Sequence, residues 1–298
     1  MNYLITGGTG LIGKALISSL GTINNTITVL TRDIEKASSL LNKEIKFIDE
    51  LLLSSIENID VIINLTGEPI ADKRWSQEQK YKICESRWDI TEKLAHLISI
   101  AHKPPSLFIS GSAIGMYGRQ GNKILDEGFS QHNKEFTHEV CTRWEQLALE
   151  ASSTNTRVAL LRTGIVLDKN SGALSKMLLP FKLGVGGKIG KGEQMMSWIH
   201  IKDMVAAILH IIDINSLNGP INITSPNAVS NEVFSKNLAS VLQRPCIFNT
   251  SPVLLKLMFG EMADLLLFGQ NVIPQKLINS GFRFKHADLT SAFKDLLK

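Results

Sequence analysis

Four glycines lie within eight residues near the start of the chain, in the stretch TGGTGLIG at positions 6–13. At this spacing Gly7 lets the chain turn, Gly10 lets a pyrophosphate approach the backbone, and Gly13 lets a helix pack closely on a strand. An apolar run precedes the stretch, helical spacing follows it, and a second apolar run begins near Ile27. In this context the pattern predicts a dinucleotide held at a helix N-terminus, where free N–H groups and the helix dipole favour phosphate. The alternative is a glycine turn that only helps packing.

The end of the second apolar run bears on which dinucleotide is bound. A site for NAD usually places Asp or Glu there, to accept a hydrogen bond from the ribose 2′-hydroxyl. This chain has VLTRD, with Thr31 and Arg32 followed by Asp33. An arginine suits a 2′-phosphate through charge-assisted hydrogen bonds, so we predict NADP (NADPH) as cofactor, with Thr31 and Arg32 as contacts and NAD less favoured. The carboxylate of Asp33, one residue later, would instead favour NAD.

Strands that alternate with helices must position these residues. Apolar runs at Tyr3–Thr6, ITVLTR, IKFID, DVIINLTG, SLFISGS and RVALLRTGIVL are separated by helical patterns, the longest from Gln77 to Ile100. Almost continuously apolar strands predict an α/β fold, a Rossmann-type doubly wound parallel sheet covered on both faces. The sequence becomes glycine-rich after Leu167. We therefore expect a Rossmann domain over residues 1–167 and about 200–226, and a smaller C-terminal α/β substrate or lid domain over 168–199 and 227–298.

Composition narrows the class of protein. The net charge is 32 − 28 = +4 over 298 residues, and Lys and Arg form no dense stripe, which argues against nucleic-acid binding. The three cysteines have no CxxC spacing and read as reduced thiols of a cytoplasmic protein. The late apolar stretch PVLLKLMFGEMADLLLFG contains charges, so it predicts a buried helical segment and no membrane span. We expect a monomer or homodimer that acts on a small molecule.

Longer stretches of the sequence carry a resemblance to a known family. They include SGSAIGMYG, LTGEPIADKRW, SRWDITEKL, GALSKMLLPFKLGVGGKIGKGEQMMSWIH and GEMADLLLFGQNVIPQKLINSGFRF. With the glycine stretch they resemble the extended short-chain dehydrogenase/reductase superfamily, and more closely its atypical branch, the NAD-dependent epimerase/dehydratase family of SDR39U1-like proteins with a C-terminal domain of unknown function. The resemblance covers essentially the whole chain. It implies an NADP-binding Rossmann domain and a smaller C-terminal domain that closes a cleft over the nicotinamide.

Further cofactor contacts follow from this resemblance. It implies that the fourth strand ends along the adenine and ribose, that the next helix carries a residue near the cofactor, and that a turn after the sixth strand packs beside the nicotinamide. The residues so implied, with those of the glycine turn, are Thr9, Leu11, Ile12, Leu65, Thr66, Gly67, Arg87, Gly111, Thr163 and Val166. A half-buried Arg87 needs an anion, and a cofactor group or an acidic side chain would serve.

The chain departs from the superfamily where proton transfer is expected. Related enzymes carry Ser or Thr and then Tyr-xxx-Lys on one helix, where the lysine lowers the tyrosine pKa. No Tyr-xxx-Lys occurs here: Cys141 stands at the tyrosine place and Glu145 at the lysine place. A carboxylate one turn away raises the pKa of a thiol, which favours Cys141 as a packed helix residue.

Ser112, Tyr117 and Cys141 are therefore the candidate catalytic residues. We expect Ser112 to orient a carbonyl and Tyr117 to supply the proton, against the alternatives of a backbone-bonded hydroxyl and a packed ring. Two functions stay open: an oxidoreductase or epimerase that acts by hydride transfer, or a non-catalytic NADP(H)-binding sensor or regulatory protein. The histidines show no metal-ligand spacing, so no metal is predicted. His200 and Asp203 in WIHIKDM match a superfamily motif that joins the two domains.

Overall fold

A parallel sheet forms the centre of the molecule, as seen in a computed structural model that describes residues 1–41 and 44–298. Its strands are β1 (Asn2–Thr6), β2 (Thr26–Leu30), β3 (Lys46–Ile48), β4 (Val61–Asn64), β5 (Leu107–Ala113), β7 (Arg157–Thr163) and β12 (Gly219–Ile223). Their order is β12-β7-β5-β4-β1-β2-β3, and every pairing is parallel. The predicted α/β Rossmann-type sheet is confirmed.

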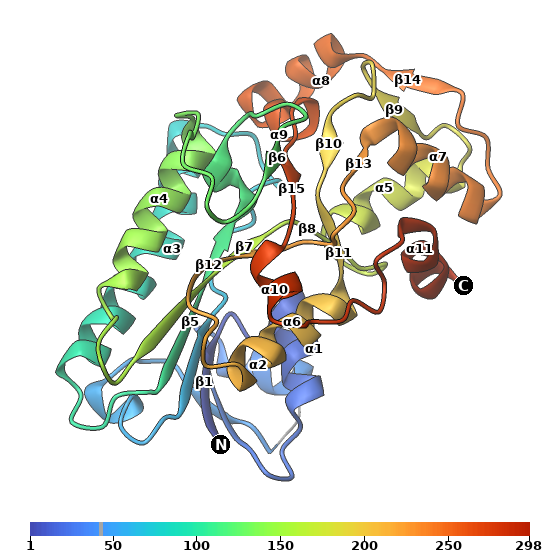
Figure 1. Cartoon of the computed structure of the whole chain (residues 1–298). Helices are drawn as coiled ribbons and strands as arrows, with labels where there is room; N and C mark the ends of the chain where they lie inside the picture. The colour runs from blue at the N-terminus through green and yellow to red at the C-terminus, as the bar shows by residue number, and fades with distance from the viewer. Residues whose placement is uncertain (42–43) are drawn as a thin grey trace.

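Helices cover both faces of the sheet (Figure 1). They are α1 (Leu11–Leu20), α2 (Ile34–Leu40), α3 (Gln77–Ile100), α4 (Phe136–Leu149) and α6 (Ile201–Asp213). Apolar side chains of α1 and α6 pack against alternate strand residues such as Ile5, Ile63 and Ile109. The intervening residues, such as Ile62 and Phe108, pack on α3 and α4. This two-sided burial explains why the strand sequences are apolar throughout rather than alternating.

A second group of elements lies beyond the carboxyl ends of the strands. It contains β8 (Ile165–Leu167), α5 (Gly172–Lys182), β9 (Gly187–Ile189), β10 (Met195–Met196), β11 (Trp198–His200), β13 (Val229–Ser230), α7 (Asn231–Leu242), β14 (Phe248–Thr250), α8 (Pro252–Phe259), α9 (Asp264–Leu267) and α11 (Leu289–Leu297). Helix α10 (Gln275–Asn279) lies apart from this group and packs on the edge strand β12. The short elements are η1 (Leu53–Ser55), η2 (Ile114–Tyr117), β6 (Ile124–Leu125), η3 (Gly260–Ala263) and β15 (Asn271–Val272). Helices α5, α7 and α11 share their own apolar cluster around Phe234 and Phe293. The domain boundaries stay a prediction.

The run RVALLRTGIVL forms two strands, and the break at Gly164 lies within the turn expected after the sixth strand. Strand β7 ends at Thr163, and β8 pairs instead with β11 outside the main sheet. Gly164 permits the change of direction, because a Cβ there would lie 2.5 Å from the carbonyl oxygen of Ser197. Only glycine allows so close a backbone approach.

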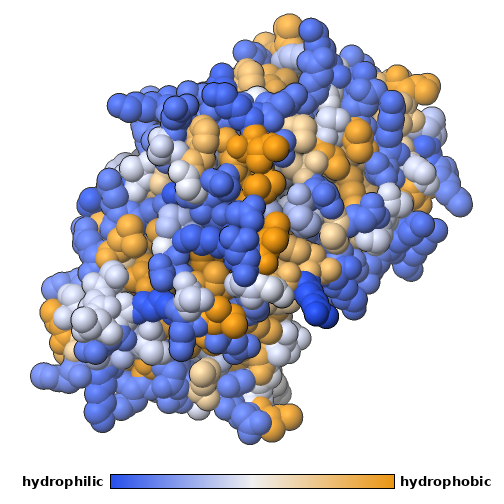
Figure 2. Space-filling model, in the orientation of Figure 1, coloured by the Kyte–Doolittle hydropathy of each residue, from blue (hydrophilic) through white to orange (hydrophobic). Residues whose placement is uncertain are grey.

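The late apolar stretch is helical, but the prediction that it is buried was wrong. Val253, Leu257 and Met258 of α8 are exposed, while Leu255 is buried. Figure 2 shows apolar side chains at the upper end of the molecule, where α8 lies in Figure 1. Of the helices in the described ranges, none is long and apolar enough to cross a bilayer.

Candidate functional site

The glycine turn joins β1 to α1 at the carboxyl edge of the sheet. Gly7 has φ of +68°, and a Cβ there would lie 2.6 Å from the carbonyl oxygen of Leu65. A Cβ on Gly13 would lie 2.4 Å from the carbonyl oxygen of Gly7. Gly10 is the exposed N-cap of α1 and offers no side-chain cap, so the first N–H groups of the helix are open to an anion. The turn therefore fits a pyrophosphate group, with the neighbouring backbone of Thr9, Leu11 and Ile12 around it.

After β2, Arg32 is exposed to solvent, whereas the carboxylate of Asp33 caps the next helix. Asp33 is the N-cap of α2 and accepts a hydrogen bond from the backbone N–H of Lys36 at 2.9 Å. Thr31 Oγ1 accepts from the backbone N–H of Asp33 at 3.3 Å. Arg32 is exposed and has no ion pair with any described residue. The carboxylate that argued for NAD is thus engaged as a helix cap, which leaves Arg32 free for a ligand.

Arg87 is held by backbone carbonyl groups rather than by an acidic side chain, and its contact with the cofactor stays a prediction. Its Nη2 donates to the carbonyl oxygen of Glu68 at 3.0 Å and its Nη1 to that of Ile83 at 2.8 Å. Its guanidinium lies against Gly67, where a Cβ would be 2.9 Å from Cζ, and 5.3 Å from the Trp144 ring. Burial lowers the pKa of Arg87, and no carboxylate of the described chain pairs with it. In this structure Arg87 ties the loop after β4, with Leu65 and Thr66 at its start, to α3.

Gly111 is covered by a side chain of α4. A Cβ on Gly111 would lie 2.7 Å from the Trp144 ring, and the residue is buried. Trp144 Nε1 donates to Thr91 Oγ1 at 3.0 Å, and Asn64 Nδ2 donates to the same oxygen at 2.8 Å. Gly111 therefore allows α4 to pack closely on β5. Thr163 at the end of β7 and Val166 in β8 are partly exposed.

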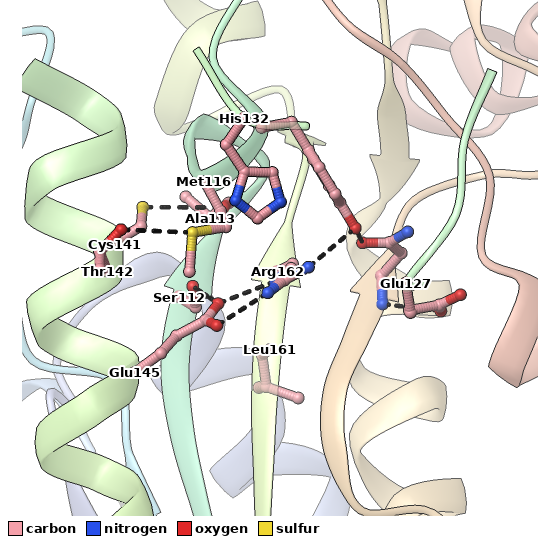
Figure 3. Close-up of polar contacts among 12 residues, drawn as sticks. Ser112, Ala113, Met116, Glu127, His132, Cys141, Thr142, Glu145, Leu161 and Arg162 are labelled. Atoms are coloured by element: carbon pink, nitrogen blue, oxygen red, sulfur yellow. Dashed lines mark hydrogen bonds and ion pairs between the residues drawn. The ribbon is translucent and has the colours of Figure 1, made fainter. Parts of the chain in front are cut away.

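Ser112, Glu145 and Arg162 form a buried hydrogen-bonded cluster at the end of β5 (Figure 3). Ser112 Oγ donates to Glu145 Oε1 at 2.6 Å. Arg162 holds the same carboxylate with two bonds, from Nε to Oε1 and from Nη2 to Oε2, both 2.9 Å long. Burial alone would lower the pKa of Arg162, but Glu145 raises it above its usual value. Ser112 and Arg162 are register partners on β5 and β7, which brings them side by side.

Tyr117 extends this cluster toward the C-terminal elements. Its hydroxyl donates to Asn222 Oδ1 at 2.7 Å, lies 3.1 Å from the carbonyl oxygen of Asp126, and accepts from Arg162 Nη1 at 3.2 Å. Asn222 Nδ2 in turn donates to the carbonyl oxygen of Ile273. The side chain of Tyr117 is fully buried, and burial raises the pKa of its hydroxyl. The geometry favours a positioning role for Tyr117 over the predicted proton supply.

Cys141 lies beside Ser112 on α4 as a buried thiol. Its Sγ donates to the carbonyl oxygen of Ala113 at 3.7 Å. The pKa of Cys141 is raised to about 12, because burial and the nearby Glu145 both disfavour the thiolate. A nucleophilic or basic role for Cys141 is disfavoured on this ground.

A cavity opens away from this cluster. It has a volume of about 370 Å³ and lies between the loop after η2, the β9–β10 segment and the chain around α9. Arg119, Lys191 and Phe268 are among its lining residues, whereas Ser112 and Cys141 are not. Arg119 forms ion pairs with Glu135, which precedes α4, and with Asp264 of α9.

A second polar cluster joins α6 to the C-terminal segment. The ligand atoms of His200, His286 and Asp295 lie within 4.8 Å of one another. His200 Nδ1 accepts a hydrogen bond from the backbone N–H of Lys202, so the neutral ring carries its proton on Nε2 and cannot bind a metal there. Asp203 accepts from the backbone N–H groups of Lys285 and His286. These contacts agree with the joining role that the motif WIHIKDM indicated.

Sequence reasoning missed Arg162 and assigned Glu145 no role beyond perturbing Cys141. A signal existed for Arg162, since RVALLRT carries a charged residue inside an otherwise apolar strand. Such a residue is almost never fully buried unless it is paired. Nothing local in the sequence indicated that its partner would be Glu145, which lies 17 residues earlier on another element.

The fold and the glycine turn together define a nucleotide-binding Rossmann protein of the short-chain dehydrogenase/reductase type. Residues 3–224 match the model of the NAD dependent epimerase/dehydratase family, and residues 252–296 match a domain of unknown function, DUF1731. The chain belongs to the NAD dependent epimerase/dehydratase family.

Relatives and solved structures agree with this assignment. The epimerase family protein SH2119 of Staphylococcus haemolyticus is 37% identical over 99% of this chain and 98% of its own length. The structure of human epimerase family protein SDR39U1 (isoform 2) with NADPH is 30% identical, with a TM-score of 0.90 and 99% of each chain covered. UDP-glucuronic acid 4-epimerase from Bacillus cereus, in complex with UDP-glucuronic acid and NAD, is 16% identical with a TM-score of 0.77, covering 99% and 98% of the two chains, a likeness of fold alone.

Proposed function

We propose that this protein binds NADP(H) along the carboxyl edge of its sheet and is an oxidoreductase or epimerase that acts by hydride transfer on a small molecule. The observation that carries the proposal is the glycine turn, whose open helix N-terminus and close backbone contacts fit a pyrophosphate. The similar human protein with bound NADPH supports it. When bound, the nicotinamide would give or take a hydride, while the chain's own residues orient the small molecule and hold its proton.

The preference for NADP(H) rests on Arg32. Replacing it in Arg32→Ala should weaken NADPH binding by about 1.5–3 kcal/mol, the scale of hydrogen bonds to a charged group, and leave NADH binding nearly unchanged. The matched control is Lys36→Ala, which removes an exposed cation from the same segment. Calorimetric titration of both cofactors measures the effect. Equal losses for NADPH and NADH in Arg32→Ala would contradict the preference.

A non-catalytic NADP(H)-binding sensor is the second candidate. It is favoured by the absence of Tyr-xxx-Lys, with Tyr117 buried and the pKa of Cys141 raised to about 12. The two candidates separate in one assay, in which bound NADPH is offered a panel of carbonyl compounds and bound NADP⁺ a panel of alcohols. Absorbance change with any compound supports the enzyme, and tight cofactor binding without turnover across both panels supports the sensor.

A further inference from the structure

The outward face of α8 is apolar where a helix that faces water is normally polar. Val253, Leu254, Leu257 and Met258 follow an i, i+1, i+4, i+5 spacing, so they share one side of the helix. Val253 and Leu257 are 76% and 74% exposed, whereas Leu255 on the opposite side is buried. The helix thus packs one apolar face on the protein, and no described part of the chain covers the other.

Two neighbouring segments extend this uncovered face. A Cβ on Gly184, after α5, would lie 3.6 Å from Pro245, and Arg244 Nε donates to the carbonyl oxygen of Lys182 at 2.9 Å. Only Ser251 separates β14 from α8. Figure 2 shows apolar side chains along the upper end and upper right of the molecule, where α8 and β14 lie in Figure 1. We call this surface the apolar tip, and its exposed members include Leu183, Ile247, Phe248, Val253, Leu257 and Met258.

Uncompensated positive charges border the apolar tip. Lys182 ends α5, Arg244 precedes β14, and Lys256 lies on α8 beside the apolar face. All three are exposed and have no ion pair with any described residue. The nearby carboxylate of Glu261 is already paired with Lys80, at 2.6 Å. The surface therefore combines aliphatic side chains with free cations.

This combination decides between the occupants that could cover the tip. In a symmetric dimer the tip would meet the same tip of a second copy, so its cations would face one another and repel. The centres of protein–protein interfaces are rich in Trp and Tyr, and the apolar tip has neither. A bilayer with anionic lipids takes up aliphatic side chains at its surface and attracts the lysines and arginines around them.

We propose that the apolar tip is a docking surface for an anionic lipid bilayer, with lipid phosphates facing Lys182, Arg244 and Lys256. The contact is peripheral, and it goes beyond the proposed function because it involves neither the glycine turn nor the cofactor. Pro252 begins α8 and also lines the cavity of about 370 Å³. Docking by the tip therefore places this cavity beside the lipid headgroups.

Co-sedimentation with vesicles tests the proposal on the full chain without cofactor. One vesicle preparation contains equal parts of phosphatidylglycerol and phosphatidylcholine, and the other contains phosphatidylcholine alone. Each cation near an anionic surface contributes about 1 kcal/mol, or about fivefold in affinity, so the wild type should bind the anionic vesicles at least tenfold more tightly. Raising the salt from about 0.1 M to about 0.5 M should weaken this binding.

Variants of the tip separate its apolar and charged contributions. Val253→Asp/Leu257→Asp should weaken binding to the anionic vesicles more than tenfold, and Lys182→Glu/Arg244→Glu should do so at least tenfold. The matched controls are Ile23→Asp, at a residue 94% exposed in the loop after α1, and Lys46→Glu, at an exposed residue of β3; both should bind as the wild type does. Thermal melts confirm that each variant is folded.

Several outcomes would overturn the proposal. They are failure of the wild type to bind anionic vesicles, equal binding to both preparations, and tip variants that bind no worse than their controls. Analytical ultracentrifugation tests the second copy as occupant: a wild-type dimer that Val253→Asp/Leu257→Asp converts to a monomer would show that another copy covers the tip. A folded wild type that is monomeric and ignores vesicles would instead leave an acidic protein as the occupant, which also overturns the proposal.

Discussion

Loss of Arg162 should destabilise the fold more than loss of any exposed cation. Arg162 and Glu145 each have a side chain only 6% exposed, and the arginine donates two hydrogen bonds to the carboxylate and one to Tyr117. Arg162→Met leaves a charged carboxylate buried with Ser112 as its remaining donor. Breaking a buried pair in this way typically costs about 3–5 kcal/mol of unfolding free energy. Urea unfolding followed by tryptophan fluorescence measures the loss.

A double variant and a variant of an exposed ion pair serve as controls for this prediction. Glu145→Met/Arg162→Met removes both charges and should recover most of the stability, because no uncompensated charge remains. Arg143→Met breaks the exposed pair with Glu92, whose atoms lie 3.6 Å apart, and should cost less than about 1 kcal/mol. The reasoning is refuted if Arg162→Met costs no more than Arg143→Met, or if the double variant is as unstable as Arg162→Met.

Two further predictions concern the glycine turn and the histidine cluster. Gly13→Ala should reduce NADPH affinity more than tenfold and lower the melting temperature, because the new Cβ would lie 2.4 Å from the carbonyl oxygen of Gly7. Calorimetric titration and thermal melts measure the two effects, and Ser18→Ala at an exposed position of the same helix is the control. The pKa of His200 is lowered to about 4, mainly by burial, so the unfolded chain binds the proton more readily. Stability should therefore be full above about pH 6.5 and fall by up to about 3 kcal/mol toward pH 4. His200→Asn keeps a cap acceptor and should flatten this slope in urea unfolding; an unchanged slope would exclude His200 as its cause.

The sheet and the cofactor edge were predictable because they rest on local patterns. Continuous apolar runs such as VIIN indicated strands buried on both faces, and Gln77 and Ile100 bound the longest helix as the sequence indicated. The glycine turn is also local, since Gly7 and Gly13 meet each other within one turn of chain. Patterns of this kind depend only on residues that are close together in the sequence, so they can be recognised without knowledge of the tertiary structure.

The cluster of Ser112, Glu145 and Arg162 was not predictable, because its members meet only through the tertiary fold. Ser112 and Arg162 become neighbours through strand register, and Glu145 reaches both from α4.

The exposed face of α8 was missed for a related reason. Apolar composition indicates a helix but does not say which neighbours cover it, and Val253 and Leu257 have none that bury them.

In place of Tyr-xxx-Lys, the chain has a buried Arg162–Glu145 pair beside Ser112. A buried Arg–Glu pair contributes little net stability, since desolvation offsets its attraction, so its main consequence here is orientation. The pair aims the Ser112 hydroxyl, and through Tyr117 and Asn222 it connects that hydroxyl to the C-terminal segment at Ile273.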